Sequence, residues 1–447
     1  YSKLDFSFLL QSGGTQEPEK ALRLMESAPV LAEDIGEAIP SVFVDQEGYQ
    51  PESDKLAVLI GEELPDEVFV VNRETGEEVL RVATEKREGV AIADFTALSE
   101  EGEYILRAAI LGESYPFAVR EGLYREVAKR LTGVFSLAPG ATVGWQETGT
   151  ESLASRALAV KMLLLSYEMN EEIWAGDDAD GNGVPDIIDL TTLETARILG
   201  ITEEALSAKK ATEETQTLTV EEKLLCAAAL ADYAYQYRQF DERVANGSLQ
   251  AADAAFQRAM KENGAQEADE TLVFFSAAEL YRASGSARYT RYLNDYFANV
   301  YAQEADRGVY EFLGEYAYIF ARQKVDVAVC TSITKKLMQH AEEISAAIPK
   351  HFIMQDASAA ARQAGEAPET EAMLSDVVRL AAADTLIPNH EYDTLIENRL
   401  HTLLGVNERA ESRIEGAGFR ACAPSEAVNR SFLQSAACVF LCSVVAN

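Results

Sequence analysis

Six oxygen-bearing positions in the stretch DADGNGVPDIID, residues 178–189, have the residue types and spacing that bind a cation. Positions 1, 3, 5, 7, 9 and 12 of a calcium loop correspond to Asp178, Asp180, Asn182, Val184 (through its carbonyl), Asp186 and Asp189. Gly183 occupies position 6, where such a loop turns sharply. Because oxygen ligands at this spacing favour a hard cation over zinc, the pattern predicts calcium. The alternative is a simple turn into a helix, with Asp186 near the helix start, where a carboxylate is favourable.

The composition limits the partners of this chain. It has 74 Asp and Glu against 39 Lys and Arg, a formal net charge of −35. That charge repels nucleic acid and anionic membranes, whereas neutral sugars and cations are compatible partners. No run of about 18 apolar residues occurs, so no membrane span is expected. The first residue is Tyr1 rather than Met, which fits a processed or trimmed chain. We expect an extracellular, secreted protein of bacterial origin. The cysteines lack zinc spacing and are expected to be buried free thiols: Cys226, Cys330, Cys422, Cys438 and Cys442.

Two regions with different apolar patterns must position these residues. After a linker-like extension (1–38), residues 39–120 hold seven short runs rich in β-branched and aromatic residues, separated by turn signals. This pattern predicts an immunoglobulin-like β-sandwich. Residues 121–447 have helical apolar spacing, as at Leu153, Ala157, Val160 and Leu164. Roughly ten to twelve helices, several apolar on nearly all faces, predict an (α/α)6 barrel of inner and outer helices. A helical solenoid is the alternative, but no fixed-period repeat is present.

Several segments, in this order, resemble family 9 of the glycoside hydrolases, the cellulase group. VFVDQEGYQPESDKLAVL (42–59) and IADFTALSEEGEYIL (92–106) resemble its N-terminal immunoglobulin-like domain. GNGVPDIIDL (181–190), FFSAAELYRASGSARY (274–289) and residues 373–407 resemble its helical domain. The resemblance implies a secreted protein of polysaccharide degradation whose partner is a β-glucan or another polysaccharide.

The chemistry that this resemblance implies needs two carboxyl groups, one to activate water and one to protonate the leaving oxygen. The family's base motif, W-Y-D-A-G-D-Y, corresponds here to WQETGTE, residues 145–151. Glu147 therefore replaces the first Asp, and Thr150 replaces the Asp that acts as base. Trp145 is retained, and it is the candidate for stacking on a sugar.

The family's acid motif, N-E-x-A-I-x-W-N, corresponds to NRSFLQSA, residues 429–436, which places Arg430 at the acid. A shift of four residues would place Glu426 there instead. The family's H-x-R substrate motif has no counterpart in residues 408–426, which contain no His. A threonine hydroxyl is no base near neutral pH, and a guanidinium is not a useful proton donor.

We therefore interpret the chain as a family 9-like protein with impaired catalysis. One alternative is an active endo-β-glucanase with a shifted acid pair, such as Glu147 with Glu426 or with Glu151. Another alternative is a non-catalytic glycan-binding or structural protein.

Overall fold

The computed structural model describes residues 39–87, 90–133, 152–207, 218–262, 268–302, 305, 307–347, 370–407, 409–423, 427–428 and 431–446. The chain divides into two compact units, residues 1–40 and residues 41–447. The second unit contains an all-β part and an all-α part.

The all-β part is a sandwich, as the seven apolar runs predicted, and each of those runs contains a strand. The described strands are β1 (Val42–Phe43), β2 (Gly48–Tyr49), β3 (Leu56–Ile60), β4 (Glu67–Asn72), β5 (Glu78–Arg87), β6 (Val90–Asp94), β7 (Gly102–Ala108), β8 (Gly112–Glu113) and β9 (Phe117–Val119). The pairing order is β1-β3-β6-β5-β4-β7-β9-β2, with β8 on β7. The long strand β5 pairs with β4 through its first half and with β6 through residues 84–87, so it belongs to both sheets.

Aromatic packing fills the sandwich core. The Tyr49 ring meets the edges of Phe95 and Phe117 at centroid distances of 5.1 and 5.5 Å. Gly48, with φ of 128°, lets β2 approach β9 closely, because a Cβ there would lie 2.0 Å from the Ala118 carbonyl oxygen. The sandwich thus has its own core and a tightly held strand at one edge.

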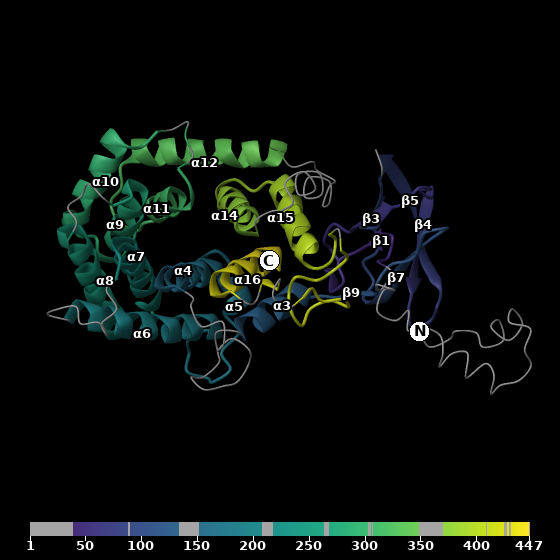
Figure 1. Cartoon of the computed structure of the whole chain (residues 1–447), viewed down its shortest axis with the longest axis horizontal. Helices are drawn as coiled ribbons and strands as arrows, with labels where there is room; N and C mark the ends of the chain where they lie inside the picture. The colour runs from purple at the N-terminus through teal and green to yellow at the C-terminus, as the bar shows by residue number, and fades with distance from the viewer. Residues whose placement is uncertain are drawn as a thin grey trace, which may run out of the picture. The chain divides into compact units, whose positions relative to one another are not determined.

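The all-α part is an (α/α)6 barrel, which confirms the predicted fold class (Figure 1). Its inner helices are α4 (Leu153–Met169), α7 (Val220–Tyr237), α9 (Glu270–Ser284), α11 (Val309–Ile319), α14 (Thr370–Leu386) and α16 (Phe432–Val445). Its outer helices are α3 (Leu123–Thr132), α6 (Asp186–Ser207), α8 (Glu242–Glu262), α10 (Ala287–Asn299), α12 (Val327–Ala347) and α15 (His390–Leu403). A short helix, α5 (Glu171–Trp174), lies between α4 and α6.

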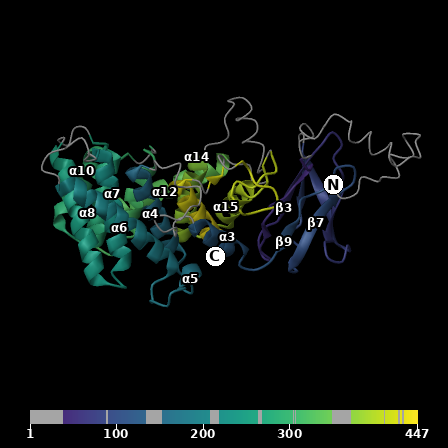
Figure 2. The same cartoon turned by 60° about the horizontal axis from the view of Figure 1, so that its bottom comes forward.

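Apolar inner helices build the barrel core. The predicted stripe Leu153, Ala157, Val160 and Leu164 is buried throughout. Outer helices pair with inner ones, as α8 does with α7 (Figure 2). Gly314 lets α11 approach α9, because a Cβ at that position would lie 2.6 Å from the Phe274 ring. The five cysteines are thiols outside disulfides, four of them buried and Cys330 half-buried. None of the described helices has the length and apolarity needed to cross a membrane.

Candidate functional site

The residues that sequence reasoning placed in the catalytic centre lie outside the described residues. They are Trp145, Glu147, Thr150, Glu151, Glu426 and Arg430. The described chain resumes at Ser152, whose side chain accepts from the backbone N–H of Ser155 and caps α4. It resumes again at Ser431, whose side chain caps α16 by accepting from the N–H of Gln434.

The helices that follow the candidate base and acid begin side by side. The Arg156 guanidinium, in the first turn of α4, lies over the ring of Phe432, the first residue of α16, at 4.5 Å. Arg156 also donates to Glu194 of α6 at 3.0 Å, with Glu194 almost fully buried. The N-terminal ends of α4 and α16 are therefore fixed next to each other.

Aromatic and ionic side chains of other inner helices lie near their own N-terminal ends. The Tyr310 hydroxyl of α11 donates to Glu221 of α7 at 3.2 Å, and both are in the first turn of their helices. Burial raises the pKa of Tyr310 to about 12, so its hydroxyl stays protonated. Tyr316 and Tyr318 are buried in the core, whereas Tyr301 and Tyr310 are half-buried.

The barrel interior holds a buried ionic cluster, defined as Lys161, Glu168, Asp232, Glu279 and Arg282. Lys161 Nζ donates to Asp232 at 2.7 Å and to Glu279 at 2.6 Å, and all three side chains are at most 1% exposed. Arg282 pairs with Glu168 and lies 3.4 Å from Asp232. Burial raises the pKa of Glu279 to about 7. Repulsion from Asp232 adds to the rise, and the charges of Lys161 and Arg282 only partly offset it.

This ionic cluster was not anticipated from the sequence. The signal available was a charged residue inside an otherwise apolar helix, such as Lys161 in α4 or Asp232 in α7. Because such residues are almost never fully buried unless paired, each one indicated a buried partner. The cluster ties α4, α7 and α9 together inside the barrel, where it is closed to a polymer substrate.

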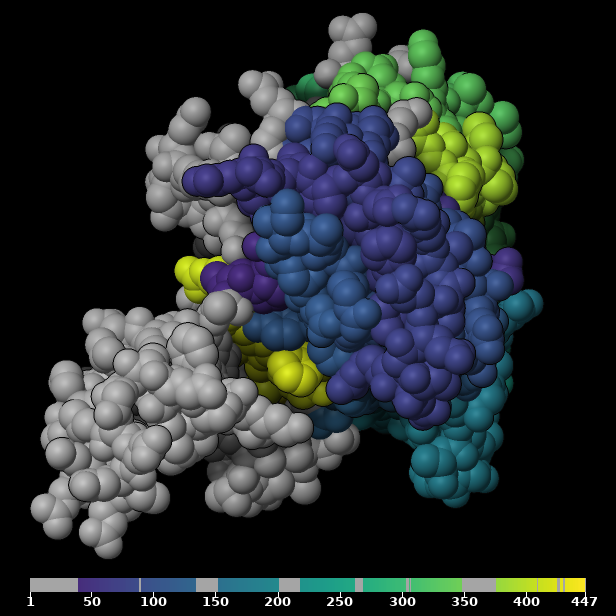
Figure 3. Space-filling view, turned by 90° about the vertical axis from the view of Figure 1, so that its right-hand side faces the viewer, coloured from purple at the N-terminus to yellow at the C-terminus, as the bar shows by residue number. Residues whose placement is uncertain are grey.

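A second polar cluster joins the sandwich to the barrel. His401 Nδ1 and Asp45 Oδ2 lie 2.8 Å apart and both side chains are buried. Burial raises the pKa of Asp45 to about 6, against the lowering effect of its hydrogen bond with His401. The Gln46 side chain donates to the Ala410 carbonyl at 2.7 Å and accepts the N–H of Arg420 at 2.7 Å. Figure 3 shows C-terminal residues, in yellow, directly beside the sandwich, in purple and blue.

The predicted cation loop brings four of its five candidate ligand side chains together, those of Asp178, Asp180, Asn182 and Asp189. Asn182 Nδ2 donates to Asp180 at 3.1 Å and to Asp189 at 2.9 Å. Asp178 accepts the backbone N–H groups of Asn182 and Gly183 at 3.1 and 2.9 Å. Gly183 has φ of 84°, as the sharp turn requires. Asp186 starts α6 and accepts from the Ala179 N–H at 2.9 Å, and Val184 is buried.

The oxygen ligands of this loop suit a hard cation, although in this structure its carboxylates accept hydrogen bonds from backbone and amide N–H groups. In the part of the chain that the structure describes, no three His, Cys, Asp or Glu side chains are grouped as metal ligands. Burial raises the pKa of Asp189, and repulsion from Asp180, Asp186 and Asp178 adds to the effect. The loop is thus short of positive charge.

A residue just before the predicted loop anchors it. Asp177, which the spacing did not single out, is almost fully buried. It accepts from Arg125 at 2.6 Å and from Lys129 at 2.7 Å, both on α3. Because one buried carboxylate takes two cations, Asp177 holds the loop against the outer helix that leaves the sandwich.

Comparisons with known proteins support the domain order. Residues 37–113 match the sequence model of the cellulase N-terminal Ig-like domain. None of the curated proteins matches the chain. The matched range contains eight of the nine strands described above, β1 to β8.

Solved structures resemble nearly the whole chain in fold. A metagenome-derived glycoside hydrolase family 9 endoglucanase has a TM-score of 0.72 at 18% identity, over 91% of this chain and 98% of that one. A single mutant of the thermostable endoglucanase from Alicyclobacillus acidocaldarius has a TM-score of 0.72 at 16% identity, over 91% and 100%. AaCel9A in complex with cellobiose-like isofagomine has a TM-score of 0.70 at 16% identity, over 91% and 99%. The chain therefore has the fold and domain order of the family 9 glycoside hydrolases, with an immunoglobulin-like domain of the cellulase type at its N-terminal side.

Proposed function

We propose that this chain is a secreted, cellulase-like protein of polysaccharide metabolism that binds a β-glucan but hydrolyses it poorly or not at all. The observation that carries the proposal is the pair of residues at the start of two adjacent inner helices. Thr150 precedes α4 and Arg430 precedes α16, where the family resemblance requires a base and an acid. Neither side chain supplies a carboxyl group, and hydrolysis by this chemistry needs two.

Binding of a glucan is a separate part of the proposal. It is supported by Trp145 in the retained motif and by the fold similarity to a protein solved in complex with cellobiose-like isofagomine. An aromatic face next to polar groups suits the apolar face and hydroxyl edge of a sugar ring. Retention on insoluble cellulose, reduced in Trp145→Ala but not in Trp174→Phe, checks this part, because Trp174 is buried in the core. Detection of the protein in the medium of its source cells checks secretion.

Restoration of the acid pair tests the catalytic part. Reducing-sugar release from amorphous cellulose and mixed-linkage β-glucan is expected to be at background for the parent chain. The double variant Thr150→Asp with Arg430→Glu should gain release, since it supplies both carboxyl groups. The matched control, Thr148→Asp with Arg430→Glu, makes the same chemical change at a neighbouring position and should stay at background. Turnover by the parent that disappears in Glu147→Ala or Glu426→Ala would contradict impaired catalysis and favour the shifted acid pair.

We also propose that the loop of residues 178–189 binds calcium. Support comes from the oxygen donors of Asp178, Asp180 and Asp189 and from the mutual repulsion of these carboxylates. A ligand present at about 100 times its dissociation constant adds about 2.7 kcal/mol to the free energy of unfolding. Calcium should therefore raise the melting temperature relative to a chelator, and Asp178→Asn should abolish the difference whereas Glu172→Asn should not. Equal melting temperatures in calcium and chelator would reject this site.

A further inference from the structure

The buried ionic cluster of the barrel holds more carboxylates than cations. Three carboxylates, those of Glu168, Asp232 and Glu279, face two cations. Only Glu168 is partly exposed, at 18%, and the other four side chains are at most 1% exposed. With every group ionised, the cluster would therefore keep an uncompensated negative charge inside the barrel. Because such a charge is costly to bury, one of the carboxylates is favoured to bind a proton.

Two of the three carboxylates use both of their oxygens as acceptors. Asp232 accepts from Lys161 at 2.7 Å through Oδ2 and from Arg282 at 3.4 Å through Oδ1. Glu168 accepts from Arg282 through one oxygen and from the Gln236 amide at 2.9 Å through the other. Hydrogen bonds to both oxygens favour the charged form of a carboxyl group, so neither residue is the one to bind the proton.

Glu279 is the exception. Its Oε1 accepts from Lys161 at 2.6 Å, but its buried Oε2 has no hydrogen-bond partner among the described residues. The Arg282 guanidinium lies 3.6 Å from Oε2, beyond hydrogen-bonding distance. The oxygen that no donor uses is thus the place for the proton. Burial and repulsion from Asp232 act in the same direction, since both raise the pKa of Glu279.

The other titratable groups in and around the cluster come from α4, α7, α9 and α11: Lys161, Glu168, Asp232, Arg282 and Tyr316. Burial lowers the pKa of Lys161 and of Arg282, but the neighbouring carboxylates outweigh burial, so both pKa values rise and both side chains stay charged. The Tyr316 ring lies 5.8 and 5.9 Å from these two cations, and burial raises the pKa of its hydroxyl well above the ordinary value. Glu279 is therefore the group of the cluster that changes its charge near neutral pH.

A second buried group of charges provides a comparison within the same barrel. Lys336 donates to Glu311 at 2.6 Å and to Glu315 at 3.0 Å, and all three side chains are at most 6% exposed. Here both oxygens of Glu311 are used. Its Oε1 accepts from the Tyr296 hydroxyl at 2.5 Å, and its Oε2 also accepts the backbone N–H of Arg307 at 3.1 Å. Glu311 is thus a buried glutamate like Glu279, but without an unused oxygen.

We propose that Glu279 is a pH-sensitive switch in the barrel, where uptake of one proton neutralises the buried ionic cluster and strengthens the packing of α4, α7 and α9. Release of the proton leaves a buried charge uncompensated and weakens the same packing. The barrel is therefore held most firmly in mildly acidic surroundings. Lys161 and Arg156 both lie on α4, so the switch acts on the helix whose N-terminal end contacts α16 at Phe432. The proposal does not depend on glucan binding, hydrolysis or calcium.

Urea unfolding of the full chain at pH 5 and at pH 8 tests the proposal. A carboxyl group whose pKa is raised in the folded chain stabilises it below the unfolded pKa, and this contribution is lost as pH rises through the folded pKa. For Glu279, the ratio of folded to unfolded chain should fall about tenfold to a hundredfold from pH 5 to pH 8. Glu279→Gln keeps the shape of the protonated acid without a titrating group. It should remove this part of the pH dependence and be at least as stable as the parent at pH 8.

A second variant and two controls keep the test decisive. Asp232→Asn leaves two carboxylates facing two cations, so it should also reduce the pH dependence, even if Glu279→Gln does not fold. The matched control Glu311→Gln should keep the pH dependence of the parent.

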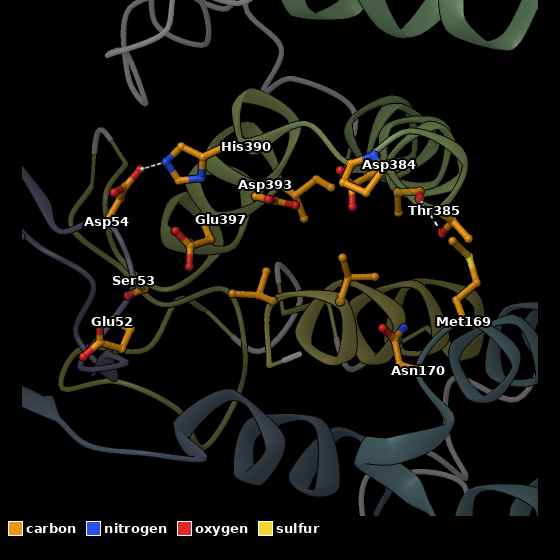
Figure 4. Close-up of a pocket in the computed structure, with 15 residues that line it drawn as sticks. Glu52, Ser53, Asp54, Met169, Asn170, Asp384, Thr385, His390, Asp393 and Glu397 are labelled. Atoms are coloured by element: carbon orange, nitrogen blue, oxygen red, sulfur yellow. Dashed lines mark hydrogen bonds and ion pairs between the residues drawn. The ribbon is translucent and has the colours of Figure 1, made fainter.

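Burial also raises the pKa of Glu397 to about 7, and this residue lines a pocket outside the buried ionic cluster (Figure 4). The effect of Glu279→Gln should therefore be the same in a Glu397→Gln background. Unchanged pH dependence in whichever of Glu279→Gln and Asp232→Asn folds, or an equal reduction in Glu311→Gln, would overturn the proposal.

Discussion

Replacing Lys161 with methionine should severely destabilise the barrel. Its ammonium group is the closest cation to both Asp232 and Glu279, at 2.7 and 2.6 Å, and the three side chains are at most 1% exposed. Methionine keeps the apolar length of lysine, so the variant removes the charge with little change in packing volume. Breaking a buried ion pair on one side costs about 3–5 kcal/mol, because the remaining charge is left uncompensated. Arg282, which is 3.4 Å from Asp232, is the one remaining cation of the cluster.

The effect of Lys161→Met should depend on pH. The Lys161 charge lowers the pKa of Glu279 against its burial, so its removal raises that pKa further. Protonated Glu279 needs no cation, and the loss of unfolding free energy should therefore be smaller at pH 5 than at pH 8. Adding Glu279→Gln to Lys161→Met should recover part of the loss at pH 8.

Urea unfolding followed by far-ultraviolet circular dichroism measures these differences. Lys86→Met is the matched control, because Lys86 makes an exposed ion pair with Asp66 at 2.7 Å. An exposed pair of the same length contributes little, so its unfolding midpoint should not change. A loss below about 1 kcal/mol for Lys161→Met, the size expected of a surface pair, would refute the reasoning from burial.

Three further predictions follow from the described contacts. Gly314→Ala should lower the free energy of unfolding by about 1–3 kcal/mol, because its Cβ would meet the Phe274 ring. The matched helical change is Gly247→Ala, whose Cβ would meet nothing within 4 Å, and it should raise the free energy of unfolding by about 0.5–1 kcal/mol. Equal effects of Gly314→Ala and Gly247→Ala would contradict the close packing of α9 and α11. The melting temperature should rise as pH falls from 8 to 5. Burial raises the pKa values of folded Glu279 and Glu397 to about 7, so in this range they bind protons that the unfolded chain does not. A melting temperature that stays flat or falls would contradict those raised pKa values. Gln46→Ala should speed hydrogen exchange at the Phe419 and Arg420 amides, which bond to its side chain at 3.1 and 2.7 Å; exchange unchanged from the parent would show that other contacts protect them.

The sequence was sufficient to predict the strands and helices whose apolar pattern follows directly from burial. Strands β3 to β7 coincide with apolar runs, and α16 is buried on all sides from Ser435 to Ser443, as its apolar sequence indicates. It was insufficient for the sheet order, because β5 alternates partners along its length. Pairing partners are chosen by packing across the sandwich, which a run of ten residues does not encode.

The family resemblance and the cation loop could be read from the sequence because their residues are contiguous. Asp178 to Asp189 lie within one short stretch of sequence, and Thr150 lies inside a recognisable motif. In contrast, Asp45 and His401 are 356 positions apart, and the spacing of either residue says nothing about the other. A pocket at the C-terminal ends of α4 and α16 likewise gathers Asp54, Asn170 and Glu397 from three distant segments.

The sequence by itself determined an immunoglobulin-like sandwich, a following helical barrel and the replacement of the family's base and acid by Thr150 and Arg430. The tertiary structure alone decided which charges are buried together, as in the Lys161 cluster, and which ends of α4, α14 and α16 meet around a cavity. The physical reason is that periodicity records only whether a residue is buried. Its partner, and hence its charge state and chemistry, depends on how the chain brings distant segments together.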